Sequence, residues 1–174
     1  MSDEALNTAQ EAVAAEQDNQ LLTFWLDGQL YGAAIDHVDQ IISMQPISSV
    51  PEFPPYAKGI INLRGSIIPV IDLRLRLGKQ ETAYTERTCI VNILVGNQQL
   101  GCIVDAVDAV VHVTDDQILP PPQMSEKTSA NRYLTGIAQL STESGGAEKV
   151  VLCLDLTKLL LQDEFSALND AVEN

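Results

Sequence analysis

The chain has 174 residues, of which 45% are hydrophobic, and its formal net charge at pH 7 is −14. This length suffices for one ordinary domain or two closely packed halves with a real core. Nucleic acid is a poor partner for so acidic a chain, because phosphate binding requires clustered Lys and Arg. No apolar run is long enough to cross a bilayer and no secretory signal is visible, which predicts a cytoplasmic protein without membrane insertion.

Residues 1–20 contain five acidic residues, no basic residue and few bulky side chains, so we predict a disordered acidic leader. From residue 21 onward, short apolar runs alternate with turns rich in Gly and Pro. These runs predict strands at 21–26, 30–35, 38–44, 60–63, 67–71, 89–95, 99–104, 109–113, 134–140 and 150–154. Pro69 within the fifth run favours an edge or a bulge.

Two helical segments are expected among these strands. Residues 73–77 can form one or two turns before Gly78. Asp155 is expected to cap a closing helix from residue 156 to about residue 168, with an apolar stripe along one face. Residues 163–174 contain four acidic residues and no basic one, and are expected to be the acidic end of that helix or a tail.

The sequence contains an internal duplication. Gly32 and Gly101 begin equivalent segments that reach an Asp four residues later, after two aliphatic residues, and then continue to Val-Asp and two more aliphatic residues. Further on, Val-Ile-Asp72-Leu has its counterpart in Cys-Leu-Asp155-Leu. A duplicated β-unit with five short strands per copy predicts a mainly β fold of two five-stranded barrel subdomains, at about 21–80 and 85–162.

We find no cluster of reactive residues. His37 and His112 have no Cys or His at metal-ligand spacing, and surface positions explain them better than a metal site does. The aspartate pairs at 36/39 and 105/108 recur in both copies, which favours a role in turns over acid–base catalysis. Phosphate-binding and nucleophile-elbow motifs are missing. The sequence therefore predicts no enzyme activity, no metal and no cofactor.

Cys89, Cys102 and Cys153 all lie in apolar runs of strand length. An odd number of cysteines in such runs indicates buried thiols in a reducing compartment rather than a disulfide framework. We expect all three to react slowly with an aqueous thiol reagent while the protein is folded.

Arg64 breaks the symmetry between the two copies. It follows the fourth predicted strand in Ile-Ile-Asn-Leu-Arg64-Gly, whereas the counterpart Ala-Gln-Leu-Ser141 carries no charge. One interpretation is a solvated charge or an ion pair with Asp72. The other is an interface hot spot, because a guanidinium beside exposed aliphatic residues is typical of binding surfaces.

The segment Lys-Gly-Ile-Ile-Asn-Leu-Arg-Gly at 58–65 is highly specific, and so is Ile-Pro-Val-Ile-Asp-Leu-Arg at 68–74. Gly-Cys-Ile-Val-Asp-Ala-Val at 101–107 and Tyr-Leu-Thr-Gly at 133–136 continue the pattern. In these motifs, and from about residue 21 to residue 161, the chain resembles the CheW family of chemotaxis coupling proteins. The resemblance implies two five-stranded, SH3-like barrels around a shared core, without catalytic activity.

The resemblance also implies an adaptor function in two-component chemotaxis signalling. The protein would couple methyl-accepting chemoreceptors to the histidine kinase CheA, and would be recruited from the cytoplasm to membrane-associated receptor arrays. The receptor tip would dock between the barrels at the positions that match the family or lie on the matching second stretch: Val38, Gln40, Leu63, Arg64, Val107 and Val110. Lys58 and Gly59 are the candidates for contact with the regulatory domain of the kinase. The family usually has Glu where this chain has Gln40, so this chain lacks the negative charge at that point.

Two alternatives remain open from the sequence. A coupling protein of the same fold could serve pilus motility or surface signalling. A small-ligand receptor or an enzyme could also be built on a duplicated β scaffold; a screen of metabolites by thermal shift would reveal a ligand receptor.

Overall fold

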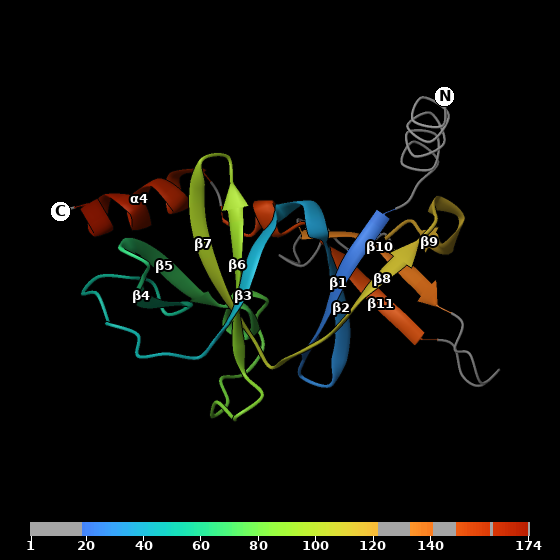
Figure 1. Cartoon of the computed structure of the whole chain (residues 1–174), viewed down its shortest axis with the longest axis horizontal. Coiled ribbons are helices and arrows are strands. Elements are labelled where there is room, and N and C mark those ends of the chain that lie inside the picture. The colour runs from blue at the N-terminus through green and yellow to red at the C-terminus, as the bar shows by residue number, and fades with distance from the viewer. Residues whose placement is uncertain (1–18, 122–132, 141–148, 161, 174) are drawn as a thin grey trace, which may run out of the picture.

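The computed structural model describes residues 19–121, 133–140, 149–160 and 162–173, which form two β-sheets side by side (Figure 1). Subdomain A is the six-stranded sheet with the order β8-β1-β2-β11-β10-β9, and subdomain B is the five-stranded sheet with the order β3-β6-β7-β5-β4. Subdomain A contains β1 (Asn19–Leu26), β2 (Gln29–Ala34), β8 (Ala106–Val113), β9 (Ile118–Leu119), β10 (Leu134–Leu140) and β11 (Lys149–Leu154). Subdomain B contains β3 (Val38–Ser43), β4 (Ala57–Leu63), β5 (Ser66–Asp72), β6 (Cys89–Val95) and β7 (Gln98–Val104). The predicted mainly β fold is confirmed.

Within the described residues, every helix except one is about a single turn long. The helices are the 3₁₀ turns η1 (Ile35–His37), η2 (Asp115–Gln117) and η3 (Leu156–Lys158), and the α-helices α2 (Leu73–Arg76) and α4 (Gln162–Glu173). The predicted turns at 73–77 are confirmed as α2. The single closing helix from residue 156 is wrong: Asp155 does cap a turn, but α4 begins only at Gln162. The segment after Asp155 forms only the single 3₁₀ turn η3, and Leu156, Leu159 and Leu160 are buried there.

The predicted leader overlaps the first strand. Asn19 and Gln20 belong to β1, and Gln20 pairs with His112 of β8. The rest of the leader, residues 1–18, lies outside the described residues.

Each sheet takes strands from both copies of the duplicated unit. The first two strands of the first copy, β1 and β2, pair with β8 and β11 of the second copy, while β6 and β7 join β3, β4 and β5. The sheets therefore divide the chain differently from the ranges 21–80 and 85–162. The short connection η1 carries the chain from one sheet to the other, and Asp105 does the same between β7 and β8. A sequence repeat identifies equivalent strands but not their partners.

The duplicated residues nevertheless occupy equivalent places. In subdomain A, Gly32 of β2 is aligned with Cys153 of the parallel strand β11; in subdomain B, Gly101 of β7 is aligned with Val70 of the parallel strand β5. Cys153 and Val70 are themselves counterparts in the repeat. A Cβ atom on Gly32 would lie 2.8 Å from a methyl group of Val151, so close packing between the strands explains the glycine.

Pro69 lies in an interior strand and not at an edge. β5 runs between β7 and β4. Its ladder with β7 begins only at Val70, so the missing N–H group of Pro69 falls outside that ladder.

The largest core lies between the two subdomains. β1, β2, β6 and β7 are buried on both faces: Leu22 and Phe24 point into the shared core, for example, while Leu21 points into the interior of subdomain A. Ile68 and Ile90 belong to the corresponding interior of subdomain B. The subdomains therefore pack back to back and share one hydrophobic layer.

Equivalent bulges distort the outer strands β3 and β8. The register shifts at Asp39 in β3 and at Asp108 in β8. Each Asp accepts a hydrogen bond from a buried polar residue of the neighbouring strand, from Asn92 at 3.2 Å and from Thr23 at 2.9 Å. These bonds satisfy polar groups that would otherwise be costly to bury, which gives both aspartates a structural role.

Candidate functional site

An ion-pair cluster fixes subdomain B against subdomain A. Arg74, on α2 after β5, donates to Asp105 from Nη2 at 2.7 Å and from Nε at 2.8 Å, and Asp27 of the β1–β2 turn lies 3.5 Å from Nη1. Asp105 also accepts the backbone N–H of Asp27 at 2.9 Å. Partial burial alone would raise the pKa of Asp105, but the hydrogen bonds from Arg74 and Asp27 hold it below its ordinary value. The pair belongs to the scaffold that positions both faces.

A second cluster joins the ends of the two copies. The guanidinium of Arg76 lies 4.5 Å from the ring centre of Tyr56 and 5.7 Å from that of Tyr133, and these tyrosines are counterparts in the repeat. Arg76 also donates to the carbonyl of Leu159 at 2.6 Å and to Glu164 of α4 at 2.9 Å. A cation held between two rings and a carboxylate makes this junction rigid.

The structure places Val38 and Val107 against the same shared core. They are the counterparts that open β3 and β8, each is half-buried, and each packs against the layer between the subdomains. They come from different subdomains. Both predicted receptor-contact positions therefore border the shared hydrophobic layer, one from each subdomain.

Two exposed aliphatic residues lie on these outer strands. Val110 of β8 is 50% exposed, and Ile41 of β3 is 44% exposed. The sequence analysis named Val110 but missed Ile41, although the repeat makes the two equivalent. Outer strands with exposed aliphatic side chains are typical docking elements, because their unpaired edges and apolar surface are both available to a partner.

Gln40 also lies on β3, aligned with Asn92 of β6. It is half-buried, and its amide lies 3.3 Å from the carboxylate of Asp39. A Glu at this position would lie beside that carboxylate and repel it, so the neutral Gln fits its surroundings here.

Arg64 occupies a strained turn between β4 and β5. Its φ is +54° and that of Gly65 is +88°, and the side chain of Asn62 accepts the N–H of Gly65 at 2.9 Å. Positive φ at both central positions normally selects Asn, Asp or Gly, and holding another residue there costs about 1 kcal/mol. Arg64 is exposed, and no hydrogen bond or ion pair joins it to any described residue.

The neighbours of Arg64 are anchored. Leu63 is half-buried and packs against the interior of subdomain B, as Ile42 and Met44 also do. Ile67, aligned with Asn62 across the turn, is 43% exposed and is equivalent to Val150, which is 44% exposed in subdomain A. Asp72, the ion-pair partner considered for Arg64, is engaged by the N–H groups of Arg74 and Leu75 and by the hydroxyl of Tyr84.

Lys58 and Gly59 lie at a bulge near the start of β4. Lys58 is paired with Glu81 of the loop at 79–88. Gly59 is buried with φ of +147°, and a Cβ atom there would lie 2.0 Å from the carbonyl oxygen of Ser48. Packing against the Ser48 bridge explains Gly59, while the half-buried ammonium of Lys58 stays near the surface.

The cysteines and histidines divide by burial. Cys102 and Cys153 are buried free thiols, and Cys89 is half-buried; burial raises the pKa of all three. His37 and His112 are exposed. Among the described residues, no three His, Cys, Asp or Glu side chains are grouped as metal ligands would be. Over the same part of the chain, no helix is long and apolar enough to span a membrane.

Comparison with known proteins identifies the family. The model of the CheW-like domain matches residues 20–164. A chemotaxis protein CheW from Klebsiella aerogenes is 30% identical over 97% of this chain and 98% of its own length. A probable chemotaxis protein CheW from Rhizobium etli is 32% identical over 86% of this chain and 92% of its own. The crystal structure of the scaffolding protein TtCheW from Thermoanaerobacter tengcongensis superposes with a TM-score of 0.70 at 33% identity, covering 81% of this chain and 91% of that one. The chain therefore belongs to the CheW family of chemotaxis adaptor proteins.

Proposed function

We propose that this protein couples methyl-accepting chemoreceptors to the histidine kinase CheA, by binding the cytoplasmic tip of the receptor and the regulatory domain of the kinase at the same time. It would act in the cytoplasm, recruited to membrane-associated receptor arrays. Membership of the CheW family and the naming of one solved relative as a scaffolding protein support this function. Two subdomains that share one core and each carry exposed aliphatic residues also suit an adaptor.

The receptor face we propose consists of Val38, Gln40, Ile41, Leu63, Arg64, Val107 and Val110. Arg64 is the observation that carries the assignment. It is exposed in a left-handed conformation that disfavours it, and its counterpart in the second copy carries no charge. Backbone strain retained at an exposed charged residue indicates selection for binding rather than for stability.

The kinase face we propose includes β4 and β5 of subdomain B and β11 of subdomain A, with Lys58 as its charged residue. Gly59 contributes by shaping the bulge that orients Lys58. The exposed pair Ile67 and Val150 offers equivalent apolar contacts on the two subdomains, which suits a partner domain that is itself similar to CheW.

Titration calorimetry with a receptor tip fragment and with the kinase regulatory domain tests the assignment. A hot-spot Arg contributes about 2 kcal/mol, or roughly thirtyfold in affinity. We expect Arg64→Ala to weaken receptor binding by at least about tenfold, and to weaken kinase binding less. Arg87→Ala is the matched control, because Arg87 is also exposed on this half of the chain.

The outcome separates the two interpretations of Arg64. Equal receptor affinity for wild type and Arg64→Ala would return Arg64 to the role of a solvated charge, and the receptor face would lose its main support. Loss of both affinities together with a lower melting temperature would indicate a folding defect instead.

A further inference from the structure

Asp72 and Asp155 end the last strand of each copy and make the same backbone contacts. The N–H of Asp72 donates to the carbonyl of Tyr56 at 2.8 Å, and the N–H of Asp155 donates to the carbonyl of Tyr133 at 2.8 Å. In each case one carboxylate oxygen, Oδ1, accepts the N–H group two residues later, at 2.9 Å and 3.0 Å. Capping therefore accounts for Oδ1 in both copies, and in subdomain A the hydroxyl of Thr157 also donates to Oδ1 of Asp155 at 2.5 Å.

The other oxygen, Oδ2, has different surroundings in the two subdomains. Oδ2 of Asp72 accepts the hydroxyl of Tyr84 at 2.9 Å, and Asp72 is only 1% exposed. Oδ2 of Asp155 lies 3.9 Å from the ammonium of Lys158, and that carboxylate side chain is 25% exposed. Within the described ranges, no hydroxyl donates to Oδ2 of Asp155.

The path of the chain explains the difference. After α2, the loop at 79–88 folds back over Asp72, where Lys58 of β4 pairs with Glu81 and Tyr84 reaches the carboxylate. After η3, the chain continues into α4, which packs against β5 and buries Phe165 in the shared core. The counterpart of Lys58 is Thr135, which carries no charge to hold a similar loop.

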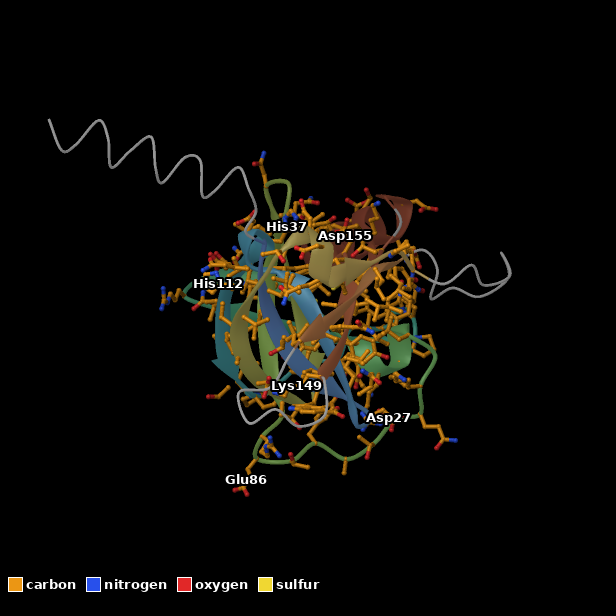
Figure 2. All side chains as sticks on the ribbon, turned by 90° about the vertical axis from the view of Figure 1, so that its right-hand side faces the viewer. Asp27, His37, Glu86, His112, Lys149 and Asp155 are labelled. Atoms are coloured by element: carbon orange, nitrogen blue, oxygen red, sulfur yellow. The ribbon has the colours of Figure 1, made fainter. Side chains whose placement is uncertain are left out.

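A pocket of about 220 Å³ opens at Asp155. It is lined by Leu21, Ala34, Ile118, His37, Thr135 and Asp155 itself. Figure 2 shows His37 and Asp155 at the same end of subdomain A, opposite Asp27, Lys149 and Glu86. Such a volume is smaller than typical ligand pockets of about 300–1,000 Å³ and suits a single ring. Apolar walls with a few convergent polar groups are the surroundings that a phenol side chain requires.

We propose that this pocket, the Asp155 pocket, binds a tyrosine side chain from an exposed loop of a partner protein, whose hydroxyl donates to Oδ2 of Asp155. Tyr84 on Asp72 is the template for the contact, and it is a tyrosine carried on a loop. The partner therefore supplies to Asp155 the tyrosine hydroxyl that the loop at 79–88 supplies to Asp72. The pocket does not include Arg64, but it borders the proposed receptor face, because His37 directly precedes Val38 of β3 and Leu21 is aligned with Val111 of β8.

The first test uses 4-methylphenol and toluene as matched probes that differ only in the hydroxyl group. Titrations of the full chain are followed by ¹⁵N NMR at Ala34, Thr135 and Leu154. We expect 4-methylphenol to bind with a Kd of about 1 mM or a few mM, as its size allows. Toluene should bind at least about fivefold more weakly, because it leaves Oδ2 without a donor. Equal binding of both probes would overturn the proposal.

Two variants locate the contact. Asp155→Asn preserves the cap, because Asn is as good a capping residue as Asp, but it replaces the carboxylate; 4-methylphenol binding should fall at least about fivefold. Thr135→Lys installs the residue that subdomain B has at this exposed position, and should close the pocket by pairing with Asp155. Unchanged binding in both folded variants would show that the phenol does not bind at Asp155.

The source of the phenol is tested with peptides. The blocked pentapeptide Thr-Ala-Tyr-Thr-Glu, which has the sequence of residues 82–86, should shift the same resonances, and the peptide with Phe in place of Tyr should bind at least about fivefold more weakly. Binding of 4-methylphenol without binding of the tyrosine peptide would show that the pocket takes free phenols only, and would overturn the protein partner.

Discussion

Subdomains A and B agree in their backbones and differ at their surfaces. Both align a glycine with the same position of a parallel strand, both bend an outer strand at an Asp, and both end on a capping Asp. They differ at the turn that carries Arg64, at the bulge residue Lys58 or Thr135, and in the loop at 79–88. Where the copies agree, most residues are explained by packing or hydrogen bonding within the chain; the exposed aliphatic pairs Ile41/Val110 and Ile67/Val150 are exceptions. Where the copies differ, at Arg64 and at the Asp155 pocket, further positions are available to partners.

Substitution of the bulge glycines tests this comparison with the largest expected effect. Gly59→Ala places a Cβ atom 2.0 Å from a backbone oxygen at φ of +147°, so we expect a loss of about 3 kcal/mol or more in the free energy of unfolding. Gly136→Ala meets a methyl group of Ile118 at 2.7 Å and the carbonyl oxygen of Leu119 at 2.9 Å, without positive φ, and should cost clearly less. Urea unfolding of both variants measures the two losses in the free energy of unfolding. Equal losses would mean that backbone strain does not distinguish the two bulges.

The ion pair between the subdomains should show the next largest effect. Arg74→Gln leaves Asp105 without its bidentate partner, and we expect a loss of about 2 kcal/mol at pH 7. Lys158→Gln is the control, because Lys158 is 63% exposed and lies 3.9 Å from Asp155. Such exposed ion pairs contribute about 0.5 kcal/mol or less to the free energy of unfolding.

The acid limb of the stability curve adds a second readout for this pair. A lowered pKa means that the stabilisation by Asp105 is present above the unfolded pKa of about 4 and is lost as the pH falls through the lower folded value. Asp105→Asn should therefore be less stable than wild type at pH 7, and the difference should shrink below pH 4. A difference that does not change with pH would indicate a packing defect.

At alkaline pH the second junction predicts a smaller effect. Burial, the hydrogen bond to Glu164 and its charge raise the pKa of Tyr56 from 10.0 to about 12. A raised pKa stabilises the folded state fully below the unfolded value, and this contribution is lost as the pH rises from about 10 through 12. Urea unfolding between pH 8 and pH 11 should give a flatter curve for Tyr56→Phe than for wild type. Parallel curves would mean that Tyr56 titrates alike in both states.

The smallest effect is expected from the acidic leader. Deletion of residues 1–18 removes no residue of β1 and almost no bulky side chain, so the melting temperature should change by less than about 2 °C. Calorimetric scans of both proteins measure it. A decrease of several degrees would show that the leader stabilises the folded protein.

Most of the strands could be predicted from the sequence, because short apolar runs between Gly and Pro fix local structure. The repeat also identified equivalent residues such as Gly32 and Gly101. Strand partners could not be predicted, since pairing depends on which faces are buried together, and here β1 and β2 bury both faces. Ile41 could have been predicted as a contact residue, because it is the counterpart of Val110 in the repeat. The Asp155 pocket could not, because it depends on where the chain runs after η3.

The exchange of strands between the two copies gives the chain the arrangement of a domain-swapped homodimer whose two subunits have been joined. Each half of the sequence completes its sheet only with strands from the other half. Neither half should fold alone, and cleavage in the loop at 79–88 should yield two fragments that stay associated as a heterodimer. The loop at 79–88, which joins the two halves, therefore fixes how many binding sites each adaptor has. A single chain has one Arg64 turn and one open Asp155 pocket, whereas a symmetric dimer would have two of each.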